Sequence, residues 1–205
     1  MLGTGAPAAD KLDVLAAYVR GETGDHVLGP AVQEAIGRIF VPDYRSTAET
    51  WRAACLLDAA PRTLNPLRRI GWAITGAVKR ARGVLSRAAR QDPAAVHATA
   101  IAVHTLVRSL QDMRALWHHP GARESVTADG AVTRSLRAPE AVLRRWSAAA
   151  ATEWGEVRPG TLTTFQLDAA CSVDPGMVFM TESWSRCPAH RWTAQLLRHV
   201  WVRAG

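Results

Sequence analysis

A chain of 205 residues, of which 48% are apolar and 21% charged, has the composition of an ordinary globular protein. No apolar run is long enough to span a bilayer, and residues 1–9 lack the pattern of a signal peptide, so we expect a cytoplasmic protein with no membrane partner. Three widely spaced cysteines exclude a disulfide framework and a C-x-x-C zinc site.

The formal net charge is +7, and arginine carries nearly all of the positive charge because Lys11 and Lys79 are the only lysines. Such an excess indicates an acidic partner, a phosphorylated ligand or nucleic acid, or else only the arginine and alanine bias of a GC-rich coding sequence. No recognised nucleic-acid-binding motif accompanies the charge, so we do not expect a nucleic-acid partner.

The first half of the chain predicts a series of short helices. Residues 1–10 are rich in Gly and Ala and are expected to be flexible, ahead of a single helical domain over residues 11–205. Ser46 and Glu49 match the S-x-x-E capping box that begins a helix. The predicted helices run over 12–19, then after a break at 21–29 from Pro30 to Pro42, from Ser46 to Pro61, and from Asn65 to about residue 90.

The helix after Asn65 is the most basic segment of the chain. Leu67, Ile70 and Ile74 begin an apolar stripe that continues to Leu85 and is expected to face inward. Its arginines mostly face outward. A solvated helix face is one interpretation of this charge, and a docking surface for an anionic partner is the other.

The longest predicted helix runs from Asp92 to Pro120 and is expected to be the spine on which shorter helices pack. Asp92 can cap its first N–H groups, and Pro93 suits the first helical position. His97 and His104 lie two turns apart on one face, too far apart to chelate a metal ion together. Apolar residues recur at three- and four-residue steps and form one stripe: Val103, Leu106, Val107, Leu110, Met113 and Trp117.

The last third of the chain predicts two helices and one strand. Pro139 begins a helix that is expected to end near Gly155, and residues 188–203 form a terminal helix. The run TLTTFQL over 161–167 is rich in β-branched and aromatic residues, which predicts a strand. The expected fold class is therefore mainly α, with a small β element near the C-terminus.

The order of these segments resembles the C-terminal half of the cytochrome P-450 family, the haem-thiolate monooxygenases. A long helix ending in LWHHP resembles the family's I helix, and PEAVLRRW resembles its K helix with E-x-x-R. RPGTLTTFQLDAACSVDP resembles the following strand segment, and RCPAHRWTA places Cys187 before a helix, as in the haem-ligand loop. The resemblance covers most of the chain after about Leu12 and implies a truncated P-450-like helical domain.

Several residues that the family uses with haem differ in this sequence. The K-helix glutamate falls at Ala141, and the acid and alcohol of the I helix fall at Val103 and His104. Cys187 remains, but the glycines that shape the ligand loop are replaced, so a rigid thiolate site is not expected. The resemblance therefore implies a haem-free protein without a cofactor. Cys187 is a metal ligand only if haem is retained, and otherwise a small half-buried residue before a helix.

Three side chains are candidates for acid–base catalysis. His104 could act as a general base, or it could be a core histidine paired with Arg108 or Gln111. Asp168 ends the strand that would line the same pocket, or is only a turn residue. Glu182 lies in the shortened loop. Candidate binding residues near the former haem space are Val103, Phe165 and Trp184.

Haem-free members of the P-450 family are best known as partner proteins. The resemblance therefore implies an auxiliary protein of bacterial natural-product biosynthesis that binds and activates or recruits a tailoring enzyme. The alternative is a cofactor-independent cyclase or isomerase acting on an apolar polyene or polyketide in the former haem pocket. The missing early helices would leave apolar surface open. We therefore expect a homodimer or a hetero-complex with a biosynthetic enzyme, with an apolar small molecule as a further candidate ligand.

Overall fold

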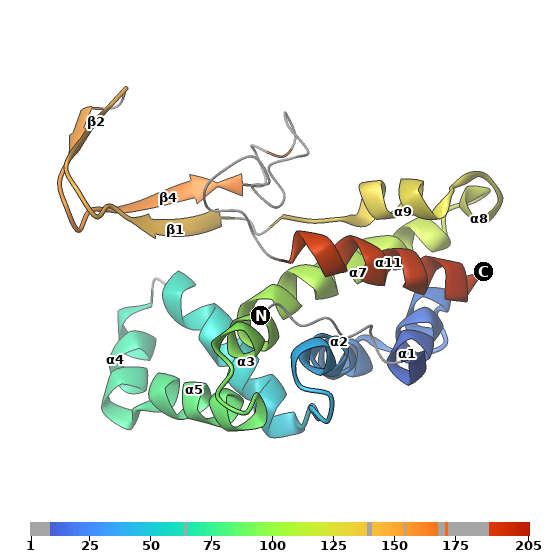
Figure 1. The fold of residues 1–205 in the computed structure, drawn as a ribbon, viewed down its shortest axis with the longest axis horizontal. Helices are drawn as coiled ribbons and strands as arrows, with labels where there is room; N and C mark the ends of the chain where they lie inside the picture. The colour runs from blue at the N-terminus through green and yellow to red at the C-terminus, as the bar shows by residue number, and fades with distance from the viewer. Residues whose placement is uncertain (1–8, 64, 139–140, 154, 168–170, 172–188) are drawn as a thin grey trace. The chain divides into compact units, whose positions relative to one another are not determined.

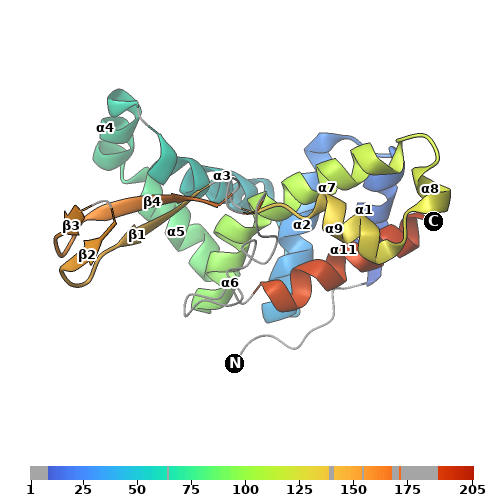
Figure 2. The ribbon, with the colours of Figure 1, turned by 90° about the horizontal axis from the view of Figure 1, so that it is seen from above.

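The computed structural model describes residues 9–63, 65–138, 141–153, 155–167, 171 and 189–205 (Figures 1 and 2). The chain divides into two units: Met1–Leu136 with Pro188–Gly205, and Arg137–Cys187. The described residues are mainly helical with small antiparallel sheets late in the chain, which confirms the expected fold class. The single domain over 11–205 stays a prediction, because contact units are not the same as independently folding domains. Most of the predicted flexible stretch 1–10 lies outside the described residues.

The first unit is built from helices around α7 (Val103–Trp117). Helices α1, α2, α9 and α11 all pack against α7 (Figure 1). The other helices of this unit are α1 (Ala9–Arg20), α2 (Asp25–Phe40), α3 (Ala48–Arg62), α4 (Pro66–Thr75), α5 (Ala77–Ala88), α6 (Pro93–His97), the π-helical segment η1 (Ala98–Ala102), α8 (Ala122–Ser125), α9 (Ala128–Ser135) and α11 (His190–Ala204).

The predicted spine is confirmed as the continuous run α6–η1–α7, from Pro93 to Trp117. The Asp92 carboxylate accepts hydrogen bonds from the N–H groups of Ala94 and Ala95 at 2.8 and 3.2 Å, as a helix cap does. The predicted stripe is buried apart from Val107, which is half-buried. In the terminal helix Leu196, Leu197 and Val200 are buried and Trp192 is half-buried. The fully buried centre of this unit includes Leu15, Val19, Leu28, Val32, Ile36, Leu106, Leu110, Met113, Leu196, Leu197 and Val200.

A π-helical turn interrupts the spine, and the periodicity of the sequence did not predict it. The Val103 N–H donates to the carbonyl of Ala98, five residues back. The carbonyl of Thr99 therefore lacks the bond it would receive in an α-helix. Gln33 of α2 replaces this bond, since its Nε2 donates to the Thr99 carbonyl at 3.1 Å.

Gln33 is fully buried, and each of its amide atoms is hydrogen-bonded. Nε2 also donates to the carbonyl of Thr50 at 3.1 Å, while Oε1 accepts from the hydroxyls of Ser46 at 2.6 Å and Thr50 at 3.0 Å. One side chain thus ties α2, the start of α3 and the π-helical turn together.

The predicted capping box is wrong by one residue. Thr47, not Ser46, caps α3: its hydroxyl accepts from the Thr50 N–H at 3.2 Å, and its own N–H donates to the Thr50 hydroxyl at 2.8 Å. The Ser46 hydroxyl is used by Gln33 instead, so the helix begins later than the S-x-x-E pattern predicts.

Glu34, next to Gln33, is a buried carboxylate that collects several donors. Its Oε1 lies 2.5 Å from Nη2 of Arg38, 3.2 Å from Nζ of Lys11 and 3.3 Å from Nη1 of Arg45. Its Oε2 accepts a hydrogen bond from the backbone N–H of Ser46 at 3.3 Å. Burial acts to raise the pKa of Glu34, but the Ser46 hydrogen bond and the charges of Lys11 and Arg38 outweigh it and lower the pKa below its ordinary value.

We therefore expect Glu34→Gln to reduce the free energy of unfolding by about 2–3 kcal/mol at pH 7. A carboxylate with a lowered pKa stabilises the fold above its unfolded pKa of 4.5 and loses that contribution as the pH falls toward the folded pKa. The difference in the free energy of unfolding between wild type and Glu34→Gln, measured by urea unfolding, should become smaller below pH 4.5. Glu49→Gln, at an exposed position of α3, is the control. A gap that stays constant down to pH 3 would contradict the role of ionised Glu34.

Two helix boundaries in the first unit differ from prediction. α2 begins at Asp25, within the predicted break, so Pro30 lies inside the helix and does not begin it. Burial of Leu28, which is 1% exposed, offsets the cost of the internal proline. The single helix predicted after Asn65 is divided at Gly76, whose φ of 61° is left-handed, into α4 and α5.

The second unit contains two strand pairs. β1 (Ala141–Arg145) pairs antiparallel with β4 (Leu162–Gln166), and β2 (Ala150–Thr152) pairs with β3 (Gly155–Val157). β4 confirms the predicted strand. The helix predicted from Pro139 is wrong, because this backbone takes its hydrogen bonds from β4. Beyond β1 the pairing continues: the Trp146 N–H donates to the Thr161 carbonyl at 3.0 Å, and its indole N–H to the Thr163 hydroxyl at 2.8 Å.

Candidate functional site

The residues selected from the sequence are only partly described by the structure. Val103 is fully buried in the helical core, and Phe165 lies on β4 with 37% of its surface exposed. His104 follows the π-helical turn at the start of α7. Val103 and His104 belong to the first unit and Phe165 to the second, and their roles in a pocket stay predictions. The candidates outside the described residues are Asp168, Glu182, Trp184 and Cys187.

His104 is half-buried against α3. Its ring centroid lies 5.3 Å from that of Trp51, at 34° between the ring planes. Nε2 is buried and has no hydrogen-bond partner, so the pairing with Arg108 or Gln111 that we considered does not occur at this atom. Burial lowers the pKa of His104, and the nearby charge of Asp58, which acts to raise it, does not outweigh this effect. The imidazole is therefore neutral near pH 7. A substrate would have to displace a neighbouring side chain to reach Nε2.

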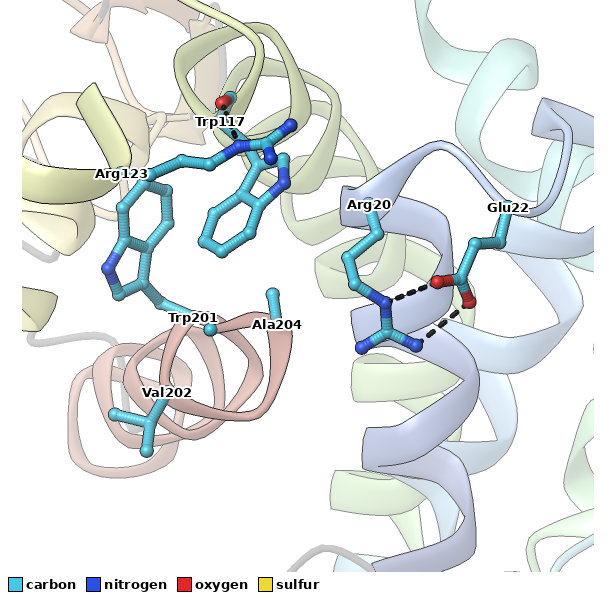
Figure 3. Close-up of a pocket in the computed structure, with 8 residues that line it drawn as sticks. Arg20, Glu22, Trp117, Arg123, Trp201, Val202 and Ala204 are labelled. Atoms are coloured by element: carbon cyan, nitrogen blue, oxygen red, sulfur yellow. Dashed lines mark hydrogen bonds and ion pairs between the residues drawn. The ribbon is translucent and has the colours of Figure 1, made fainter. Parts of the chain in front are cut away.

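A pocket of about 600 Å³ lies elsewhere in the helical unit (Figure 3). The rings of Trp117 and Trp201 meet edge to face, with their centroids 5.0 Å apart. The Arg123 guanidinium lies 5.0 Å from the Trp117 ring centroid, and Arg20 is bonded to both carboxylate oxygens of Glu22, at 2.6 and 2.8 Å. The residues that line this pocket belong to α1 and the turn after it, to α7, to α8 and to the end of α11. They are Arg20, Glu22, Trp117, Arg123, Trp201, Val202, Ala204 and Gly205.

The chemistry of this pocket is an aromatic wall between two arginines that already have partners. Arg20 is paired with Glu22, whereas Arg123 contacts the Trp117 ring and carbonyl and keeps its positive charge. None of the candidate site residues predicted from the sequence lines the pocket. The pocket could not be predicted from the sequence because its side chains come from distant parts of the chain and its tryptophans also fit core packing. Among the described residues, no three His, Cys, Asp or Glu side chains lie close enough to hold a metal ion. None of the described helices is both long and apolar enough to span a membrane.

Leu67, Ile70 and Ile74, which we call the α4 stripe, are exposed. Their exposed fractions are 78%, 54% and 82%, and α4 buries none of its residues. They are three of the six large apolar side chains exposed in the described part of the chain. The expectation that they face inward is therefore wrong. After the turn at Gly76, α5 packs on α3 and buries Ala81 and Leu85, while the stripe stays in solvent.

The ends of α4 are fixed although its apolar face is exposed. The Asn65 side chain accepts hydrogen bonds from the N–H groups of Leu67 and Arg68 at 3.0 and 3.2 Å, and Pro66 occupies the first helical position. At the other end, Arg80 donates to the carbonyl of Thr75. Helices of this length are marginal alone, so these caps help to keep α4 helical while its stripe is exposed.

The surface around the α4 stripe is basic. α4 carries Arg68 and Arg69, and α5 carries Lys79, Arg80, Arg82 and Arg87. Arg68 lies over the ring of Trp72, 5.3 Å from its centroid, on the side of α4 away from the stripe. The site that the structure offers is thus an apolar helix face with exposed basic residues on the same helix and on the next one.

Comparison with known proteins gives no relative from which a function could be transferred. A scan against protein-family models found no match, and searches of curated proteins and of solved structures found none either. The function is therefore argued from the residues described above.

Proposed function

We propose that this protein is a haem-free auxiliary protein that binds a partner enzyme through the α4 stripe and activates or recruits it. The observation that carries the proposal is the exposure of Leu67, Ile70 and Ile74 on one face of a capped helix. Burying one such side chain is worth roughly 1.5–3 kcal/mol. Apolar patches of this kind on a protein surface are typical of interaction sites.

The spacing of the stripe fits a known way of binding. Leu67, Ile70 and Ile74 stand at positions i, i+3 and i+7, which are the anchors of a helix that lies in an apolar groove. Because its caps hold α4 in a helical conformation before binding, little conformational entropy is lost when the helix docks.

The relation to the cytochrome P-450 family and the place in bacterial natural-product biosynthesis belong to this proposal, and the order of sequence segments supports them. The strand at Ala141–Arg145 departs from that order, because the resemblance expects a helix there. The family relation is therefore not what carries the proposed function. The α4 stripe supports a binding role whether or not the relation holds.

The proposal is tested by a photo-crosslinker in place of Ile74, in cells that produce the protein. We expect one defined enzyme to be crosslinked from position 74. The same crosslinker at Val202, an apolar position on α11 that is 61% exposed, should not capture it. The purified wild-type protein should bind this enzyme and raise its activity. Leu67→Ser with Ile74→Ser should weaken binding by at least about 100-fold, from the loss of two apolar anchors.

Three results would overturn this assignment. Crosslinking that is equal at positions 74 and 202, or absent from both, would remove the evidence for a specific partner. Unchanged binding by the Leu67→Ser, Ile74→Ser variant would place the interface elsewhere. A homodimer that dissociates in this variant would assign the stripe to a second copy of the chain.

The alternative function, a cofactor-independent cyclase or isomerase, stays a prediction. Of its three acid–base candidates only His104 is described, and its Nε2 is shielded. No observation in the described residues favours it over partner binding.

A further inference from the structure

The positive charge of this protein is concentrated in one segment. Residues 66–90 contain no Asp or Glu, and their seven basic residues are Arg68, Arg69, Lys79, Arg80, Arg82, Arg87 and Arg90. Without these seven, the chain would have 18 basic and 18 acidic residues, so this segment accounts for the whole net charge of +7.

Many arginines elsewhere are paired within the chain. Arg20 lies 2.6 Å from Glu22, Arg38 lies 2.5 Å from Glu34, and Arg198 lies 3.0 Å from Asp129. The protein thus neutralises much of its basic surface by itself, as expected of an ordinary folded chain.

Most of the basic residues in 66–90 have no acidic partner in the described part of the chain. Arg90 pairs with Asp43 and Arg80 caps α4, but the other five have no carboxylate within ion-pairing distance in the described part of the chain. We call these the five unpaired cations, and all of them are exposed: Arg68, Arg69, Lys79, Arg82 and Arg87. The first two share a helix with the α4 stripe, and Lys79 and Arg82 follow in the first two turns of α5.

We infer that the partner that receives the α4 stripe is an acidic protein, whose apolar groove is bordered by carboxylates that face the five unpaired cations. The inference rests on the proposed function and specifies the chemistry of the partner. The stripe supplies the apolar contact. The cations supply attraction over a longer range, which speeds encounter and selects the partner by charge.

An acidic protein fits these residues better than a membrane surface does. Helices that lie in a membrane surface carry Trp or Phe as well as Leu on the apolar face. Here Trp72 lies away from the stripe, half-buried beneath Arg68. From Leu67 to Ile74 the stripe is about 10 Å long, which matches a single groove. Its three aliphatic side chains offer roughly the hydrocarbon of one acyl chain, so membrane binding would require the five unpaired cations as a second signal, which the vesicle experiment below tests.

Nucleic acid fits the cations but not the stripe. Phosphate contacts dominate the affinity of a nucleic-acid-binding surface, and an exposed row of Leu and Ile would remain in water. The combination of apolar anchors and unpaired cations therefore favours a protein that has both a groove and acidic side chains.

The test uses the enzyme crosslinked through position 74. Its crosslinked peptide is sequenced, and we expect it to carry a net negative charge. Association of the purified enzyme with the wild-type protein is then followed at rising salt concentration. We expect the association rate to fall at least about 10-fold between 0.05 and 0.5 M salt. Arg69→Glu with Arg82→Glu should reduce the rate by a similar factor at low salt.

Arg52→Glu, an exposed position on α3 outside the basic segment, is the control for a single charge reversal and should change the rate less than about twofold. Thermal unfolding of each variant checks that the fold is intact. If the α4 stripe variants lose binding while salt and charge reversal have no effect, the acidic partner is wrong and the proposed function stands. If no enzyme is captured, both are overturned.

Binding to vesicles of phosphatidylcholine with phosphatidylserine decides between a protein and a membrane. We expect no binding at physiological salt. Vesicle binding that disappears in the Arg69→Glu, Arg82→Glu variant would assign the surface to anionic lipid and overturn the inference.

Discussion

Gln33→Met is expected to lower the free energy of unfolding by about 4 kcal/mol, and the midpoint of thermal unfolding by about 10 °C. Methionine fills a similar volume but cannot donate to the carbonyls of Thr50 and Thr99 or accept from the Ser46 and Thr50 hydroxyls. Each buried polar group left without a partner costs roughly 1–3 kcal/mol. Urea unfolding followed by circular dichroism measures the effect.

Gln111→Met is the control for this prediction, because Gln111 is exposed on α7, and its effect should stay within about 0.5 kcal/mol. Gln33→Glu adds a second comparison. It keeps the shape of the side chain but directs a carboxylate oxygen at two carbonyls, so it should be at least as destabilising. If Gln33→Met stays within about 1 kcal/mol of wild type, the π-helical turn does not depend on Gln33.

Gly37→Ala is expected to destabilise the protein by about 3 kcal/mol, although alanine normally favours a helix over glycine by about 1 kcal/mol. A Cβ at Gly37 would lie 2.3 Å from Cδ1 of Tyr44, whose ring is only 1% exposed and cannot move aside freely. The close approach of α2 to this ring requires a residue without a side chain.

Gly71→Ala provides the opposite case within the same chain. Gly71 lies inside α4, and a Cβ there would have no atom within 4 Å, so we expect the ordinary gain of about 0.5–1 kcal/mol. The two variants should therefore shift the urea midpoint in opposite directions. If both shift it upward, Tyr44 is not held in place by its surroundings.

The spine and the terminal helix could be predicted from the sequence because their signals are local and agree with each other. Asp92 and Pro93 mark the start of the spine, and a regular apolar stripe runs from Val103 to Trp117. Each of these features depends on residues within a few turns of one another, so no knowledge of distant contacts is needed.

The strand β1 and the exposure of α4 could not be predicted in this way. The segment after Pro139 fits a short helix or a strand equally well, and pairing with β4, about twenty residues later, decides between them. In α4 the apolar periodicity correctly predicted that Leu67, Ile70 and Ile74 lie on one face. It did not indicate that this face stays exposed. The left-handed turn at Gly76 separates the stripe from the face that α5 buries.

Of the candidate site, the resemblance indicated His104 but not the arrangement around it. The role of Gln33 was missed, although a glutamine on the apolar face of a helix, within AVQEAI, is a signal of a buried hydrogen-bond network. The aromatic pocket was missed because its lining comes from helices far apart in the chain.

The π-helical turn changes how the two ends of the spine face their neighbours. One additional residue in a turn rotates all later positions by about 100° relative to an unbroken α-helix. His97 and His104, which would share a face of a regular helix, differ accordingly: His97 is exposed and His104 is half-buried. The early part of the spine contacts α2, α3 and α5, whereas the later part contacts α1, α2, α9 and α11. One continuous run of helix thereby keeps α2 along its whole length while its other partners change at the π-helical turn.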